Sequence, residues 1–122
     1  MILVDSSIWI DHLHKTEAHL VTLLHSARVV QHKMVIGELA LGNISGRDAV
    51  LENLNELPTL SVATHDEVMH LVEERRLFGQ GLSLVDAHLL TSVALSPPAR
   101  IWTRDKKLEA AASELGLAFA GR

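Results

Sequence analysis

Four acidic residues suggest the chemistry of this sequence: Asp5, Glu38, Asp86 and Asp105, each of which follows an apolar run or lies inside one. Carboxylates are rare in apolar surroundings unless a cation compensates their charge. Mg²⁺ and Mn²⁺ prefer oxygen ligands of this kind. If the fold brings the acids together, we expect them to form a site for Mg²⁺ or Mn²⁺.

Three of these acids also have simpler explanations. Asp5 could simply cap the first helix, and Asp105 opens a helix where a negative charge suits the helix dipole. Ser83 and Asp86 have the spacing of a capping box, so Asp86 could bind backbone donors and nothing else. Glu38 has no such explanation, because a lone buried acid is costly. One helical turn away it meets only apolar residues and glycine: Met34, Val35, Leu41 and Gly42.

The composition describes one domain without disulfides. The chain has 122 residues, 48% of them hydrophobic and none of them cysteine, so we expect a single domain over residues 1–122 with one core. No apolar run reaches the roughly 18 residues of a membrane span, and no basic residue precedes the first apolar segment as in a signal peptide. We therefore expect a cytoplasmic protein without a membrane contact, and the apolar content favours a homodimer.

The charge excludes a typical duplex-binding module. The net charge of −4 lacks the basic excess of such modules, so a nucleic-acid contact needs a local patch or bound metal. Arg104, Lys106 and Lys107 form the one tight basic cluster, beside Asp105. This cluster is either a solvated helix start or a contact near the site.

Short β-type runs alternate with helical ones along the chain. Strands are predicted at Met1–Val4, Val29–Gln31, Leu60–Ala63, Arg100–Thr103 and Leu117–Ala120. Helical periodicity predicts helices at Ser7–His14, Ala18–Ser26, Lys33–Leu41, Arg47–Leu57, Asp66–Phe78, Leu84–Leu95 and Asp105–Leu115. This alternation predicts an α/β fold with a central parallel sheet of about five strands covered by helices on both faces.

The topology predicts one shared site. Ligands of such sheets bind beyond the carboxyl ends of the strands. Asp5 and Asp105 each come just after a predicted strand, so both belong at this rim. Glu38 and Asp86 belong to early turns of covering helices whose amino ends point to the same rim.

Four segments in order resemble the PIN-domain ribonucleases, and in particular the VapC-type toxins of toxin–antitoxin pairs. They span nearly the whole chain: Ile2-Leu3-Val4-Asp5-Ser6-Ser7-Ile8-Trp9-Ile10, Gly37-Glu38-Leu39-Ala40-Leu41-Gly42, Leu82-Ser83-Leu84-Val85-Asp86-Ala87 and Ile101-Trp102-Thr103-Arg104-Asp105-Lys106-Lys107-Leu108. One departure is Leu108, where an aromatic residue is common; this change concerns packing.

The resemblance implies a Mg²⁺- or Mn²⁺-dependent endoribonuclease that a cognate antitoxin protein neutralises. The acidic positions that hold its metal fall on Asp5, Glu38, Asp86 and Asp105. We expect the first three to be the main ligands, with Asp105 serving a second metal or positioning a water. Hydroxyl positions near the site fall on Ser6, Ser7 and Thr103. Bound metal would activate a water to cleave RNA, with no side-chain nucleophile. The family also implies a homodimer and an antitoxin tail that enters the acidic groove.

Other chemistries fit the sequence less well. The eight histidines match no ligand spacing and are expected mostly at or near the surface, while Trp9 and Trp102 are expected in the core. A phosphatase with an aspartyl nucleophile would have a second aspartate two positions after Asp5, where Ser7 stands. A binding module that keeps the fold without catalysis would lose the acids, which are present here.

Overall fold

The computed structural model describes residues 1–120 and forms three strands and seven helices in this part of the chain. The strands are β1 (Ile2–Val4), β2 (Val29–Val30) and β3 (Arg100–Trp102). The helices are α1 (Ser6–His14), α2 (Ala18–His25), α3 (Lys33–Leu41), α4 (Arg47–Asn55), α5 (His65–Glu74), α6 (Leu84–Ala94) and α7 (Lys106–Glu114).

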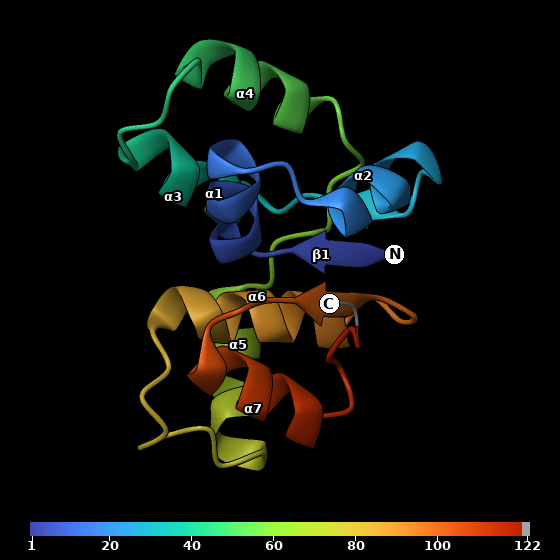
Figure 1. Cartoon of the computed structure of the whole chain (residues 1–122). Helices are drawn as coiled ribbons and strands as arrows, with labels where there is room; N and C mark the ends of the chain where they lie inside the picture. The colour runs from blue at the N-terminus through green and yellow to red at the C-terminus, as the bar shows by residue number, and fades with distance from the viewer. Residues whose placement is uncertain (121–122) are drawn as a thin grey trace.

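The strands form one parallel sheet in the order β2-β1-β3. Leu3 of β1 is paired with Val30 on one side and Ile101 on the other. The helices gather in two groups around it: α1 to α4 lie above β1 in Figure 1, and α5 to α7 lie below it. The predicted α/β fold with a parallel sheet is confirmed.

The prediction of about five strands is wrong, because the outer two segments make only isolated bridges. Thr59 bridges Gln31, and Ala118 bridges Ile101. The chain does not continue as a strand over Leu60–Ala63, where the amide of Ala63 donates instead to the Ser92 hydroxyl at 3.1 Å. An amide committed to a side chain of α6 cannot extend a ladder.

Each of the predicted helices is present, with differences at the ends. The capping box at the start of α5 forms as its spacing suggests: the Glu67 amide donates to the Thr64 hydroxyl at 3.1 Å, and the Thr64 amide donates to Glu67 at 2.8 Å. This helix ends at Glu74 rather than Phe78, because Arg76 adopts a left-handed backbone with φ of 52°. Such a conformation cannot continue a right-handed helix.

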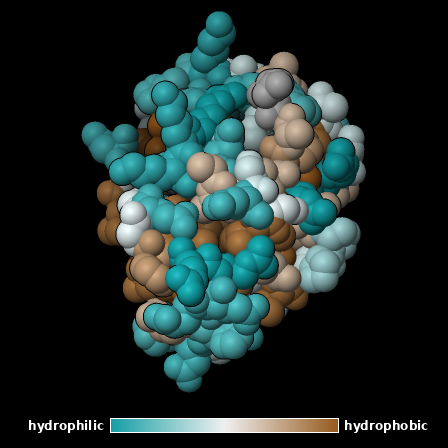
Figure 2. Space-filling model, turned by 90° about the horizontal axis from the view of Figure 1, so that it is seen from below, coloured by the Kyte–Doolittle hydropathy of each residue, from teal (hydrophilic) through white to brown (hydrophobic). Residues whose placement is uncertain are grey.

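Large apolar side chains also reach the surface. Figure 2 shows apolar surface near the middle of the face seen from below, bordered by hydrophilic side chains. The most exposed large apolar residues are Leu41 at 92%, Phe78 at 59%, Leu84 at 57% and Leu95 at 55%. Within residues 1–120, none of the helices has the length and apolar character required to cross a bilayer.

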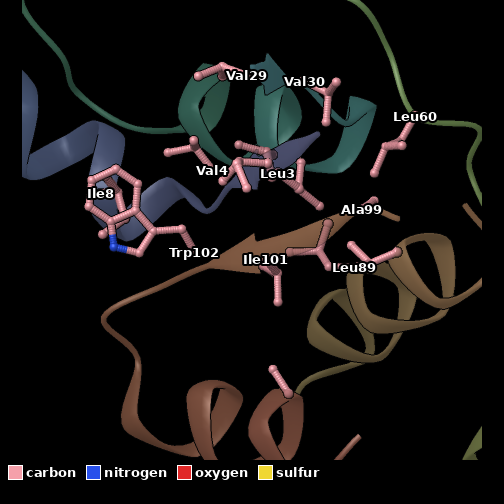
Figure 3. Close-up of a cluster of buried hydrophobic side chains, with 14 of the residues drawn as sticks. Leu3, Val4, Ile8, Val29, Val30, Leu60, Leu89, Ala99, Ile101 and Trp102 are labelled. Atoms are coloured by element: carbon pink, nitrogen blue, oxygen red, sulfur yellow. The ribbon is translucent and has the colours of Figure 1, made fainter. Parts of the chain in front are cut away.

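One core joins the sheet to both groups of helices. Figure 3 shows Leu3, Ile101 and Leu89 among the buried side chains, so residues of β1, β3 and α6 pack together. Trp9 is 7% exposed and Trp102 is 2% exposed. The prediction that both tryptophans belong to the core is confirmed. This packing fixes the carboxyl ends of β1 and β3, where the candidate site begins.

Candidate active site

Asp5 lies at the centre of the site, directly after β1. It occupies the N-cap position of α1, but its carboxylate makes no capping hydrogen bond. Its Oδ2 instead accepts hydrogen bonds from the Thr103 hydroxyl at 2.7 Å and the Ser7 hydroxyl at 2.9 Å. Asp5 is only 6% exposed. The capping explanation of this acid is therefore wrong, and two hydroxyls hold a buried carboxylate in place.

The segment after β3 supplies the second part of the site. Thr103 is 4% exposed, and its hydroxyl accepts the amide of Asp105 at 3.0 Å while donating to Asp5. The Ser7 hydroxyl accepts a hydrogen bond from the amide of Arg104 at 3.1 Å, and it lies 3.4 Å from the Thr103 hydroxyl. These bonds connect the start of α1 to residues 103–105.

Glu38 is the sixth of the nine residues of α3, beyond the early turn in which it was expected, and the Ser6 hydroxyl donates to its Oε1 at 3.3 Å. The expectation that it is buried is wrong: Glu38 is exposed on the surface of α3. Its carboxyl group is nevertheless partly shielded. Loss of hydration, followed by the charges of Asp5 and then Asp86, raises its pKa above the ordinary value, against the bond from Ser6.

Asp86 both caps a helix and belongs to the acidic cluster. The amide of Ser83 donates to its Oδ2 at 3.0 Å and the Asp86 amide donates to the Ser83 hydroxyl at 3.0 Å, so the capping box of α6 is complete. Partial burial raises the pKa of Asp86, and the Ser83 bonds oppose this shift. The charges of Asp105 and Asp5 raise the pKa further. Capping and cluster membership therefore coexist in one carboxylate.

Asp105 has the same double character. It is exposed, and as N-cap of α7 its Oδ1 accepts the amide of Leu108 at 2.9 Å. Its charge also acts on Asp86. The predicted convergence thus brings Asp5, Glu38, Asp86 and Asp105 within electrostatic reach of one another.

The donor set fits a hard divalent cation. Each of the acids binds the protein through a single oxygen: Oδ2 in Asp5 and Asp86, Oε1 in Glu38 and Oδ1 in Asp105. Among residues 1–120, no group of three or more histidine, aspartate or glutamate side chains forms a ready-made metal cage. Mg²⁺ does not require one, because it keeps several waters and is held by one or two carboxylates.

Comparison with known proteins gives the family. The chain is 56% identical over 120 residues to Ribonuclease VapC32 of Mycobacterium tuberculosis, in strains CDC 1551 / Oshkosh and ATCC 25618 / H37Rv, covering 98% of this chain and 97% of the relative. The chain belongs to the VapC family of PIN-domain ribonucleases. It matches none of the protein-family models.

A solved structure supports the fold. The crystal structure of PAE2754 from Pyrobaculum aerophilum superposes with a TM-score of 0.61 over 97% of this chain and 87% of that chain, at 23% identity. This identity is too low to carry more than the architecture. The VapC relatives and the shared fold agree with the resemblance that the four sequence segments indicate.

Two of the basic residues beside Asp105 have contacts outside the acidic cluster. Arg104 forms ion pairs with Asp11 and Glu17 at 2.7 and 2.6 Å. Lys106 and Lys107 are exposed, and the Lys107 ammonium lies over the backbone of Gly81, where an added Cβ would come within 2.8 Å of it. In this arrangement Arg104 is occupied by acids of α1 and of the segment before α2.

Sequence reasoning missed a buried histidine pair. His32 is fully buried. Its Nδ1 accepts a hydrogen bond from the amide of Met34 at 3.0 Å and so caps α3. The proton of the neutral ring is therefore on Nε2, which donates to the Ser92 hydroxyl at 2.9 Å. Burial, followed by the charge of His88, lowers the pKa of His32 to about 4. His88 is 7% exposed, and its Nδ1 is buried without a hydrogen-bond partner in residues 1–120. The sequence signal for this role was a polar residue directly before α3, at the position where a helix cap belongs. Histidine is an uncommon cap, so this signal is weak.

Proposed function

We propose that this protein is a Mg²⁺- or Mn²⁺-dependent endoribonuclease that cleaves RNA phosphodiester bonds. The observation that carries the proposal is the buried Asp5 carboxylate, held by Thr103 and Ser7 beside other acids at the carboxyl ends of parallel strands. Membership of a family of ribonucleases supports the same chemistry. Within residues 1–120 no lysine or arginine forms an ion pair with these acids, and such a gathering suits a site completed by metal.

The residues have distinct roles in this mechanism. Asp5, Glu38 and Asp86 would hold the metal, directly or through water, with Asp105 positioning a second ion or the attacking water. Bound metal lowers the pKa of water and stabilises charge on the phosphate oxygens. Ser6, Ser7 and Thr103 orient the carboxylates, as their hydrogen bonds already do. This chain supplies no side-chain nucleophile to the scissile phosphate.

The proposed biological role is that of a toxin neutralised by a cognate antitoxin. A cluster of carboxylates favours a partner that offers arginine, since guanidinium pairs with carboxylates where metal would otherwise bind. Exposed Leu41 on α3 and Leu84 at the start of α6 belong to the same helices as Glu38 and Asp86. Apolar surface beside acidic residues gives such a partner both kinds of contact, and the remaining exposed apolar residues support a homodimer. The proposed location of this toxin is the cytoplasm.

Cleavage assays test the proposal directly. Purified protein is incubated with a panel of end-labelled RNA hairpins and with p-nitrophenyl phosphate, in EDTA, Mg²⁺ or Mn²⁺. Internal cleavage of RNA that needs metal and is lost in Asp5→Asn is the expected result. Hydrolysis of the phosphomonoester alone would make the protein a phosphatase. RNA bound without cleavage under every condition would make it a binding module and overturn the proposal.

A further inference from the structure

Arg104 makes several contacts for which the proposed cleavage mechanism gives no role. Its Nη1 donates to Oδ2 of Asp11 at 2.7 Å, and its Nη2 donates to Oε2 of Glu17 at 2.6 Å. Its guanidinium carbon also lies 5.9 Å from the ring centroid of Trp102, over the ring. One cation thus joins two acids and an aromatic face, an arrangement called here the Arg104 clamp (Arg104 with Asp11 and Glu17).

The clamp joins distant parts of the chain around the site. Asp11 lies on α1, whose first turn carries Ser7, and Glu17 is the N-cap of α2. Arg104 stands between Thr103, which holds Asp5, and Asp105, which acts on Asp86. Residues 103–105, called here the 103–105 loop, are therefore held by the hydrogen bonds of the Thr103 and Ser7 hydroxyls and by the ion pairs of Arg104.

The geometry of the clamp argues against a role in binding the RNA backbone. The guanidinium donates one N–H to each of two carboxylates, and these two negative charges more than offset its single positive charge. The two acids would also repel an approaching phosphate. A phosphate that approached the remaining N–H groups of Arg104 would lie beside both carboxylates, whereas the present contacts hold the loop in the position from which Thr103 binds Asp5.

We propose that the Arg104 clamp positions the 103–105 loop for the reaction at Asp5. Arg104 is a positioning residue in this role, acting through Thr103 and Asp105 rather than on RNA. The inference rests on the proposed nuclease function. Arginine suits the task because its planar fork meets two acceptors at once, which the single ammonium of lysine does with less geometric definition.

Three substitutions each break one or both ion pairs of the clamp: Arg104→Gln, Asp11→Asn and Glu17→Gln. We expect each to lower kcat for a labelled RNA hairpin by about tenfold, because a displacement of about 1 Å at a reacting group costs up to about 100-fold. We expect KM for RNA to stay unchanged. Asp48→Asn is the matched control, because it removes an exposed ion pair with Arg47 on α4, away from the site.

The acid substitutions separate positioning from RNA binding. If Arg104 serves RNA, freeing it with Asp11→Asn should lower KM, while Arg104→Gln should raise KM. Under the clamp both substitutions change kcat in the same direction. Opposite changes in KM, or variants that cleave as fast as the parent, would overturn the positioning role.

Amide hydrogen exchange tests the clamp without catalysis. The amide of Arg104 donates to the Ser7 hydroxyl of α1 and the amide of Asp105 donates to the Thr103 hydroxyl, so releasing the clamp should speed the exchange of both amides. The amide of Ile101 in β3 donates to the Leu117 carbonyl at 2.8 Å and should keep its rate. Unchanged exchange at the loop amides in Asp11→Asn would refute the clamp even in an active nuclease. A parent that cleaves no RNA would refute the proposed function while leaving this measurement to decide the clamp.

Discussion

The hydroxyl of Thr103 donates a 2.7 Å hydrogen bond to the carboxylate of Asp5, which precedes it by 98 residues. Both side chains are buried. The bond joins the ends of two parallel strands, β1 and β3, and holds an ionisable group in the orientation that a metal would meet. The same hydrogen bond therefore bears on the stability of the fold and on the orientation of the Asp5 carboxylate.

Thr103→Val should destabilise the protein by about 1–3 kcal/mol, because a buried carboxylate loses a charge-assisted hydrogen bond and the Asp105 amide loses its acceptor. Thr103→Ser keeps the hydroxyl and should behave nearly as the parent. The measurement is urea unfolding in EDTA.

Thr91→Val is the control for the Thr103 series. Thr91 is equally buried, but its hydroxyl bonds only to the Ala87 carbonyl of its own helix at 2.7 Å. Such a bond adds little to helix stability. Equal losses in Thr91→Val and Thr103→Val would show that the effect is a general cost of burying valine and not the bond to Asp5.

Asp5→Asn should abolish most RNA cleavage while the fold persists. The amide oxygen can still accept from the two hydroxyls, but the negative charge that binds metal is lost. We expect a fall of more than about 100-fold, the usual scale for losing a group that stabilises transition-state charge. Asp66→Asn, an exposed acid of α5, should cleave normally. Circular dichroism of both variants checks folding, and a well-folded, active Asp5→Asn protein would remove Asp5 from the site.

The strands β1 and β3 were predictable because each is a short apolar run followed by a polar residue. The segment at Leu60–Ala63 has the same local pattern, yet its last amide bonds to Ser92, which lies 29 residues further along the chain. A local pattern does not contain that partner. Strand propensity therefore correctly predicted that Leu60 and Ala63 are buried, but it wrongly predicted that this segment pairs as a strand of the sheet.

The candidate site was predictable as a set of acids, and its local environments were not. The sequence around Glu38 is apolar on both sides, which suggested burial. The structure leaves both Glu38 and Leu41 exposed, although the Ser6 hydroxyl of α1 contacts the Glu38 carboxylate. Periodicity identifies an apolar face but does not show whether a partner protein is needed to cover it.

His32 should make stability fall with acid. Its folded pKa of about 4 lies below the unfolded value of about 6.5, so the unfolded state binds more protons between these values. This contribution is complete above about pH 6.5 and is lost as pH falls towards 4, by as much as about 3 kcal/mol. The raised pKa values of Glu38 and Asp86 act in the opposite direction at the acidic end.

His32→Asn separates these contributions, because asparagine can still cap α3 while it does not titrate. We expect this variant to be less stable than the parent at pH 7, with a shallower loss of melting temperature between pH 6.5 and 4 in EDTA. His70→Asn changes an exposed histidine and should keep the parent's slope. Parallel pH profiles for the parent and His32→Asn would contradict the assigned pKa.

Antitoxin binding should compete with metal if both use the acidic cluster. Excess Mn²⁺ should weaken the affinity of the antitoxin in calorimetry, and Glu38→Gln should weaken it as well, since arginine loses a charged acceptor. Asp48→Asn removes a distant exposed acid on α4 and should leave affinity unchanged. Affinity that responds to neither Mn²⁺ nor Glu38→Gln would place the antitoxin elsewhere on the surface.

Asp86→Asn decides between the two roles of that carboxylate. The raised folded pKa means that the native state penalises the ionised form, so the metal-free protein gains stability as pH falls through that pKa towards the unfolded value of about 3.9. Removing the charge should therefore stabilise the metal-free protein near pH 7. The same variant should lose most of the rise in melting temperature that Mn²⁺ gives the parent, because linked stabilisation depends on affinity for the folded state.

Glu67→Gln is the matched control for Asp86→Asn, because Glu67 fills the same capping-box position in α5 outside the acidic cluster. Loss of its charge at a helix start should cost up to about 1 kcal/mol with or without metal. If Asp86 served only as a cap, Asp86→Asn would follow this control. Melting curves of the three proteins in EDTA and in Mn²⁺ separate the roles: a variant that is less stable in EDTA and still fully stabilised by Mn²⁺ would make Asp86 a helix cap and nothing more.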